Sequence, residues 1–175
     1  MIDNCSEDKT AEIARMKGVQ VFSAERRGYQ FTLSTGLQIL SQANYEKFCI
    51  LDGDNEISLN SLDSALAKSK KYDFVVGRRP YVKRVGEKLI NRIIDYLYGV
   101  NDLMCGLKVG FLKYFNSSNN LEYGLDLFEL DKLNKDSIYN LNIDLNLRDE
   151  TRLGNSIKVN SVMILVLTKF LIRRL

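Results

Sequence analysis

The chain has 175 residues, of which 45% are hydrophobic and 27% are charged, and its net charge is +3. This balance is typical of one folded domain with a real core, and the mild charge excludes the strongly basic class of nucleic-acid-binding proteins. The absence of histidine excludes every Ser-His, Cys-His and His-ligated zinc mechanism within this chain. A catalytic base is therefore a carboxylate, Lys, Tyr or Cys, and a metal site built mainly from oxygen favours Mg²⁺ or Mn²⁺.

Short apolar runs alternate with helical patterns along the chain, which predicts an α/β fold. In the first third we expect the end of a strand at 1–2, a helix from Ser6 or Asp8 to Lys17, a strand at 19–23, a helix at 29–43 and a strand at 47–51. Beyond these we expect a helix capped by Ser58, a strand at 73–77, an amphipathic helix around 89–97, a helix at 125–133 and a strand at 139–147 with one solvent-facing side.

The segment 162–172 is apolar nearly all round and is followed by Arg173 and Arg174. It is too short to span a bilayer, which takes about 20 apolar residues. Two interpretations are open: a terminal helix buried against the domain, or a helix lying on an anionic membrane surface with its arginines at the headgroups.

Two carboxylates, Asp52 and Asp54, directly follow the predicted strand at 47–51. The ligand crevice of an α/β sheet lies at the carboxyl ends of its strands. Two ionised carboxylates at such an end repel each other, and a divalent ion that bridges them to a diphosphate relieves this repulsion. The alternative for an isolated Asp-x-Asp is a polar turn. A calcium-binding EF-hand loop is disfavoured because Ile57 stands where that loop needs Gly.

Further segments place this pair in a wider pattern; they are Ile2–Thr10, Arg27–Tyr29, Ser34–Leu37, Leu51–Asp54, Val75–Arg79, Asn91, Asp102–Lys108 and Arg152–Ser156. In order and spacing the set resembles the inverting glycosyltransferases of family 2 with the GT-A fold, and most of all the dolichyl-phosphate mannose or glucose synthases. The resemblance implies a Rossmann-like domain over 1–158, with a mostly parallel sheet and helices on both faces. A C-terminal helix at 159–175, packed or membrane-interfacial, follows.

The resemblance also implies roles for single residues. The donor nucleotide-sugar would contact a set that begins at the end of the first strand; it comprises Asp3, Asn4, Ser6, Asp52, Asp54, Arg79, Arg84 and Arg152. The Mg²⁺ or Mn²⁺ ion would be held by Asp52, Asp54 and Glu56. The arginines would bind phosphates, which suits their planar, bidentate donor geometry. Asp102 and Asp126 are the candidate catalytic carboxylates, as base or sugar-positioning groups.

Family members open with a strand that ends in Pro-x-Tyr-Asn-Glu or a close variant, followed by a helix, and this sequence shows neither. We therefore expect an N-terminally incomplete domain. Its true start lies further upstream, or another chain or a second copy supplies the strand, or the copy is a decayed and inactive one. Of these we favour a truncated or mis-started product. Unpaired backbone at the open sheet edge favours association.

The predicted function is transfer of a sugar from a GDP- or UDP-sugar to an acceptor, with a polyprenyl (dolichyl) phosphate preferred over a sugar hydroxyl. A lipid phosphate is already an anionic nucleophile and needs no base, whereas a hydroxyl acceptor needs a carboxylate such as Asp102. The predicted location is cytoplasmic, with possible peripheral contact to a membrane. The alternatives are a sugar-phosphate nucleotidyltransferase and an inactive fragment that serves as an assembly subunit.

Overall fold

The computed structural model describes residues 1–115, 128–146 and 157–172, the side chains of 157 and 158 excepted. Its helices and strands follow one another in the order β1 (Ile2–Asp3), α1 (Thr10–Met16), β2 (Phe22–Ser23), α2 (Tyr29–Gln42), β3 (Lys47–Leu51), α3 (Leu59–Lys68), β4 (Phe74–Arg78), α4 (Val85–Tyr98), β5 (Leu107–Phe111), β6 (Ile138–Asn142) and α5 (Ile157–Ile172). Short 3₁₀ turns lie at Leu112–Tyr114, Leu130–Lys132 and Lys135–Ser137. The alternation of helices and strands confirms the predicted α/β class.

The strands form two sheets, β1-β2 and β3-β5-β4-β6. The pairs β1-β2 and β4-β6 are parallel, whereas β5 runs antiparallel to both β3 and β4. In the larger sheet β3, β4 and β6 therefore share one direction, and β5 is a reversed strand inserted between two of them. The expectation of a mostly parallel sheet did not include β5, whose segment matched the family pattern without being predicted as a strand.

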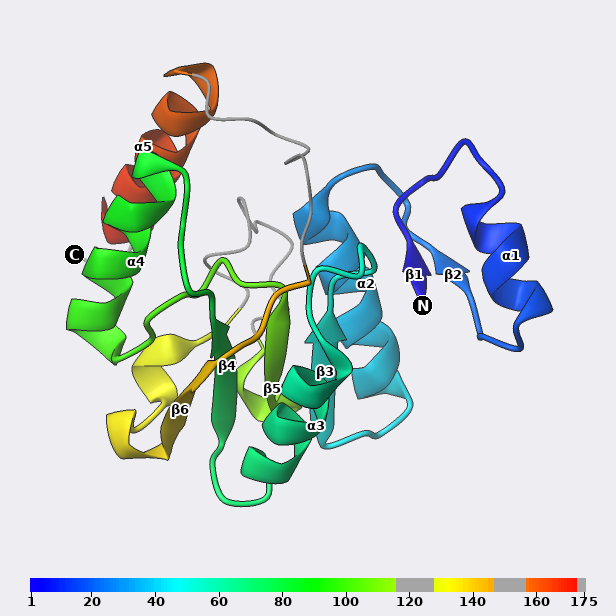
Figure 1. Ribbon diagram of the computed structural model, residues 1–175, viewed down its shortest axis with the longest axis horizontal. Coiled ribbons are helices and arrows are strands. Elements are labelled where there is room, and N and C mark those ends of the chain that lie inside the picture. The colour runs from blue at the N-terminus through cyan, green and yellow to red at the C-terminus, as the bar shows by residue number, and fades with distance from the viewer. Residues whose placement is uncertain (116–127, 147–156, 173–175) are drawn as a thin grey trace.

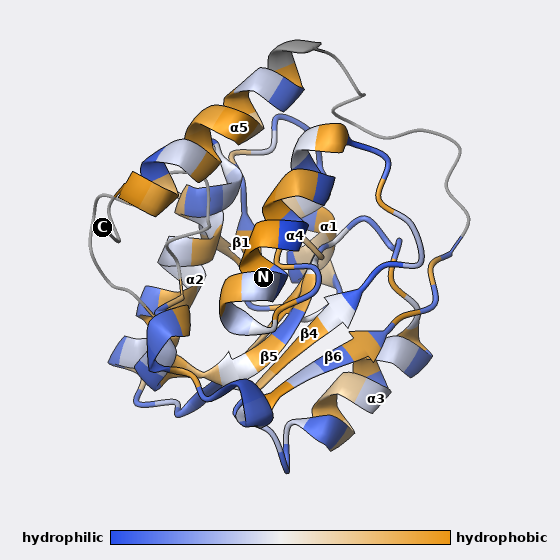
Figure 2. Ribbon diagram, turned by 90° about the vertical axis from the view of Figure 1, so that its left-hand side faces the viewer, coloured by the Kyte–Doolittle hydropathy of each residue, from blue (hydrophilic) through white to orange (hydrophobic). Residues whose placement is uncertain are grey.

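Helices cover both faces of the larger sheet, as predicted (Figures 1 and 2). On one face, α2, α4 and α5 pack over a core that includes Leu37, Phe48, Phe74, Ile90, Ile94 and Phe170. On the other face, α3 packs over a smaller core that includes Ala65, Val75, Leu107 and Ile143. The alternation of buried residues along the strands explains the two cores, because successive side chains of a strand point to opposite faces.

Local signals set several element ends as expected. The hydroxyl of Ser58 accepts a hydrogen bond from the backbone N–H of Ser61 at 3.2 Å and caps α3. Gly18 follows α1 with φ of +76°, and Gly99 ends α4 with φ of +74°, the left-handed conformation that glycine adopts at low cost. The strand expected at 19–23 is shorter, because only Phe22 and Ser23 pair with β1.

The helix expected at 125–133 is wrong for its described part. Phe128 forms an isolated bridge with Phe115, and only Leu130–Lys132 turn, as a 3₁₀ helix. Phe128 is 1% exposed, and its ring centroid lies 5.4 Å from that of Phe48 and 5.3 Å from that of Phe74. The apolar spacing in this stretch therefore comes from loop residues that fill the core, and burial overrides the helical pattern.

The C-terminal helix α5 packs along α4, and this is the most extensive helix–helix contact in the described part of the chain. Asn160 accepts a hydrogen bond from the backbone N–H of Gly86 at 2.8 Å, and Val166, Leu167 and Phe170 are buried. The opposite side of α5 exposes Ile164, Leu165 and Ile172. Among the described residues, no helix is both long and apolar enough to cross a membrane.

Candidate nucleotide-sugar site

The predicted site residues gather where strands of both sheets end. Strands β1, β3 and β4 all run upward in Figure 1, so that Asp3, Asp52 and Arg79 come at or just beyond the same edge. This is the edge at which α/β folds bind ligands. The strand end at 47–51 predicted this place for Asp52 and Asp54, whereas the family resemblance implied the roles of Asp3 and Arg79.

Asp52 lies directly against the turn that precedes β5. Its backbone N–H donates to the carbonyl of Gly106 at 3.1 Å. A Cβ atom on residue 106 would collide with the Asp52 carboxylate, so only glycine leaves room for this side chain. The close approach fixes the Asp52 carboxylate at the end of β3.

Asp54 lies two residues further on, in a turn that separates it from Glu56. Asn55 has φ of +59°, and the backbone N–H of Glu56 donates to Asp54 Oδ1 at 3.2 Å. The carbonyl of Glu56 in turn accepts from the N–H of Asn146 at 2.7 Å. This backbone pairing joins the turn after β3 to the segment after β6.

The predicted metal set of Asp52, Asp54 and Glu56 stays a prediction. Across 1–115, 128–146 and 157–172, no three His, Cys, Asp or Glu side chains are grouped so that they could hold a metal ion. Asp52 and Asp54 remain as a pair of oxygen donors, both half-buried. Two carboxylates fit Mg²⁺ or Mn²⁺, which is usually held by one or two protein carboxylates together with phosphate oxygens and water.

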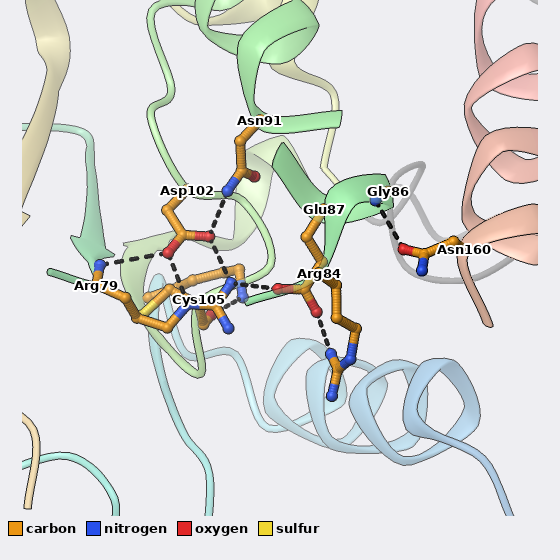
Figure 3. A network of polar contacts seen from close by, with 9 residues as sticks. Arg79, Arg84, Gly86, Glu87, Asn91, Asp102, Cys105 and Asn160 are labelled. Carbon is orange, nitrogen blue, oxygen red and sulfur yellow. Dashed lines mark hydrogen bonds and ion pairs between the residues drawn. The ribbon is translucent and has the colours of Figure 1, made fainter. Parts of the chain in front are cut away.

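Arg79, at the end of β4, is held by the buried carboxylate of Asp102 (Figure 3). Its Nε donates to Asp102 Oδ2 at 2.7 Å and its Nη2 to Oδ1 at 2.9 Å, and the backbone N–H of Arg79 donates to Oδ2 at 3.3 Å. Asn91 Nδ2 adds a fourth hydrogen bond at 2.9 Å. Asp102 is only 2% exposed, so its carboxylate is enclosed by these donors, and its catalytic role stays a prediction.

A second buried carboxylate, Glu87, extends this network. Its Oε2 accepts from Arg79 Nη2 at 3.0 Å, and its Oε1 accepts from Arg84 Nη1. Burial by itself would lower the pKa of Arg79, but the hydrogen bonds and negative charge of Asp102, with the charge of Glu87, raise that pKa above its ordinary value. Arg79 is therefore a fixed cation.

The arginine network and the aspartate pair belong to one structural unit. The backbone N–H of Cys105 donates to the carbonyl of Asp102, and one residue later Gly106 contacts Asp52. The turn 102–106 thus joins the end of β4 to the end of β3.

The end of β1 forms a separate tight turn. Asp3 Oδ2 accepts from the backbone N–H of Ser6 at 3.1 Å, and Asn4 Oδ1 accepts from the N–H of Gly28 at 2.7 Å, next to the start of α2. Asp3 is 7% exposed, and its Oδ1 has no hydrogen-bond partner in the described part of the chain. A buried carboxylate oxygen without a donor is costly and indicates a site for a ligand or water.

Three comparisons place this arrangement among known proteins. The model of glycosyl transferase family 2 matches residues 1–123. The chain belongs to this family. No curated protein matches significantly. Among solved structures, glucosyl-3-phosphoglycerate synthase from Mycobacterium tuberculosis in complex with uridine-diphosphate aligns with a TM-score of 0.71 and 19% identity, over 98% of this chain and 67% of that chain.

The same synthase in complex with Mn²⁺, uridine-diphosphate and glucosyl-3-phosphoglycerate aligns with a TM-score of 0.71 and 16% identity, over 98% of this chain and 67% of that chain. At this identity the likeness shows the fold. Together with the family match it confirms the predicted GT-A fold and glycosyltransferase class. The family match also favours a glycosyltransferase over the sugar-phosphate nucleotidyltransferase considered from the sequence.

Not every predicted site residue is placed. Asp126 and Arg152 lie outside the described residues. Conversely, sequence reasoning gave no role to Glu87 and Gly106. Glu87 and Asn91 share the buried face of α4 with Ile90 and Ile94. Two polar residues four apart on an otherwise apolar helix face were a signal of a buried polar network.

Cys105 offers a test of how tightly this site is packed. It is 0% exposed, and burial raises the pKa of its thiol from 9.0 to about 11. We expect iodoacetamide at pH 9 to modify Cys5 in the folded protein while Cys105 stays protected, as checked by peptide mass mapping. After unfolding in urea both should react. Modification of folded Cys105 at the rate of Cys5 would contradict the packing described for the turn 102–106.

The same pKa difference has a consequence for stability. In the unfolded chain the Cys105 thiol ionises near 9.0, whereas in the folded chain it keeps its proton up to about 11. Its contribution to the free energy of unfolding is therefore fully present below pH 9 and is lost as the pH rises towards 11.

Proposed function

We propose that this domain transfers a sugar from a nucleotide-diphosphate donor, with Mg²⁺ or Mn²⁺ held by Asp52 and Asp54. One observation carries the proposal: the aspartate pair lies at the end of β3, directly beside the turn that also positions Arg79. Carboxylates for a cation and a fixed guanidinium for phosphate oxygens are thereby built into one edge of the sheet.

The chemistry follows from charge. A divalent ion at this site supplies positive charge that stabilises the departing nucleoside diphosphate. Arg79 keeps three of its N–H donors on Asp102 and Glu87, and its Nη1 makes no hydrogen bond within the described residues. These two remaining donors suit a phosphate oxygen of the donor, with an orientation that the buried acids hold fixed.

The end of β1 supports a nucleotide-binding role. The unpaired Oδ1 of Asp3 is an acceptor for an N–H or O–H group, such as those on a base or ribose. Asn4 and Ser6 shape this turn through their bonds to Gly28 and Asp3. We assign Asp3 to the donor nucleoside, with Asn4 and Ser6 as the residues that fix its turn.

For the acceptor we propose a phosphate-bearing molecule. Asp102, the predicted base, is engaged by Arg79 and Asn91, and a phosphate nucleophile needs only positioning and charge neutralisation. The acceptor phosphate belongs to a polyprenyl lipid or to a small soluble acid; the phosphoglyceric acid of the Mycobacterium tuberculosis synthase is an example of the second. The exposed Ile164, Leu165 and Ile172 on α5 support peripheral contact with a membrane in the first case.

Completion of the sheet by another strand also stays a proposal. In the described part of the chain β3 pairs with β5 alone, and Cys49 and Leu51 on it are exposed. An unpaired strand edge of this kind favours pairing with another strand, from a second copy or a partner.

The experiment is a panel of labelled UDP- and GDP-sugars with Mn²⁺, each offered with polyprenyl phosphate, with 3-phosphoglycerate and without acceptor. We expect transfer from one donor to one of the two phosphate acceptors. Product with the lipid alone would identify a membrane acceptor, and product with the glycerate alone a soluble one. Failure to bind any donor in the presence of Mn²⁺ would overturn the proposed function.

A further inference from the structure

Glu87 is a buried carboxylate that the family pattern does not account for. It lies in the first turn of α4, is 3% exposed, and accepts from two different arginines, one on each of its oxygens. Arg79 directly follows β4 and Arg84 directly precedes α4. Glu87 therefore joins the two ends of the connecting segment 79–84 (Figure 3). A carboxylate is rarely buried unless it is paired, and here both partners are cations.

Glu87 contacts two arginines, and Arg79 has a second carboxylate partner in Asp102. Arg79 is already fixed by its two-pronged bond to Asp102, so the loss of Glu87 removes only one of its contacts. Arg84, whose side chain is 16% exposed, forms an ion pair with Glu87 Oε1. Two guanidinium groups on one carboxylate lie close together although like charges repel. Glu87 therefore bridges the two guanidinium groups and links the position of Arg84 to that of Arg79.

We propose that Glu87 is a positioning residue, which brings Arg84 beside Arg79 so that both act on one anionic group of the substrate. The anion class is a phosphate or diphosphate, and this inference rests on the proposed function. Because arginine pairs bind such groups through several parallel N–H donors, the separation of the two guanidinium groups matters as much as their charge.

The positioning role and the charge of Glu87 predict opposite changes in anion binding when its carboxylate is removed, so the proposal can be tested. Arg79, Arg84, Asp102 and Glu87 together carry no net charge, so replacing Glu87 by neutral Gln leaves an excess positive charge. If Glu87 merely weakened the local potential, Glu87→Gln would bind anions more tightly. If it positions Arg84, Glu87→Gln binds them more weakly.

The test is a calorimetric titration of UDP, and separately of pyrophosphate, with Mn²⁺ present. We expect Glu87→Gln to weaken binding of both by about tenfold, a typical coupling between residues of one ion-pair network. In an Arg84→Ala background, Glu87→Gln should change the affinity by less than about twofold, because Glu87 acts on the ligand through Arg84. Glu12→Gln, an exposed substitution in α1, is the matched control and should leave binding unchanged.

Each outcome bears on a separate claim. Unaltered or tighter binding by folded Glu87→Gln would overturn the positioning role, as would equal losses in the wild-type and Arg84→Ala backgrounds. Wild-type protein that binds no nucleotide would instead overturn the proposed function. Should Glu87→Gln prove unfolded by circular dichroism, Arg84→Ala alone is the decisive variant, and wild-type affinity in it would equally overturn the proposal.

Discussion

Asp52→Asn is expected to lower the rate of sugar transfer by at least about 100-fold, because the metal contributes several kcal/mol to the transition state and each 1.36 kcal/mol is a factor of ten. The substitution preserves the shape of the side chain and its packing against Gly106, while removing the charge that holds the cation. Initial rates with the active donor and acceptor, at saturating Mn²⁺, measure the effect.

Asp63→Asn is the matched control for this substitution. Asp63 is exposed on α3, on the face of the sheet opposite to α4, so its replacement should leave the transfer rate unchanged. Urea unfolding of both variants should show wild-type stability within the error of the measurement. A folded Asp52→Asn variant with wild-type activity would show that the aspartate pair does not hold a catalytic metal.

Asp102→Asn is expected to destabilise the fold by about 3–5 kcal/mol, the typical cost of removing one partner of a buried ion pair. The substitution leaves Arg79, whose side chain is only 19% exposed, without its main counter-charge. It also replaces one oxygen of an acceptor of four hydrogen bonds by an NH₂ group, whose two N–H donors face other donors. The free energy of unfolding in urea measures this loss.

A double-variant cycle separates the positioning role of Asp102 from a catalytic one. In an Arg79→Ala background, Asp102→Asn should cost at least about 1 kcal/mol less than in the wild type, because the unpaired cation is gone. If Asp102→Asn instead abolished transfer while leaving stability unchanged in both backgrounds, Asp102 would act as the base, as the sequence suggested. Asp63→Asn again provides the reference for a surface carboxylate.

The sequence was informative wherever a local signal matched the final structure. The strand at 47–51 and the acids after it, the Ser58 cap and the helix around Ile90 and Ile94 all follow from short-range patterns. The edge of the sheet at which Asp52 and Asp54 lie also follows, because both come just after the carboxyl end of a predicted strand.

The errors arose where distant contacts decide. The sequence also gave no sign of the backbone pairing of Glu56 with Asn146 or of the bond between Asp102 and Arg79, partners that are 90 and 23 residues apart in the chain. The antiparallel β5 was missed because Lys108 and Gly110 interrupt its apolar run. Phe128 fits a helical spacing in the sequence, but in the structure it packs on Phe48 and Phe74.

The most direct test of the account is a calorimetric titration of UDP and GDP into the wild-type protein, first with Mn²⁺ and then with excess EDTA. Two carboxylates that repel a diphosphate in the absence of a cation should attract it through one. We therefore predict saturable binding of one of the two nucleotides with Mn²⁺ and none with EDTA. Equal binding under both conditions, or none under either, would contradict the assignment of Asp52 and Asp54 to a metal-bridged diphosphate.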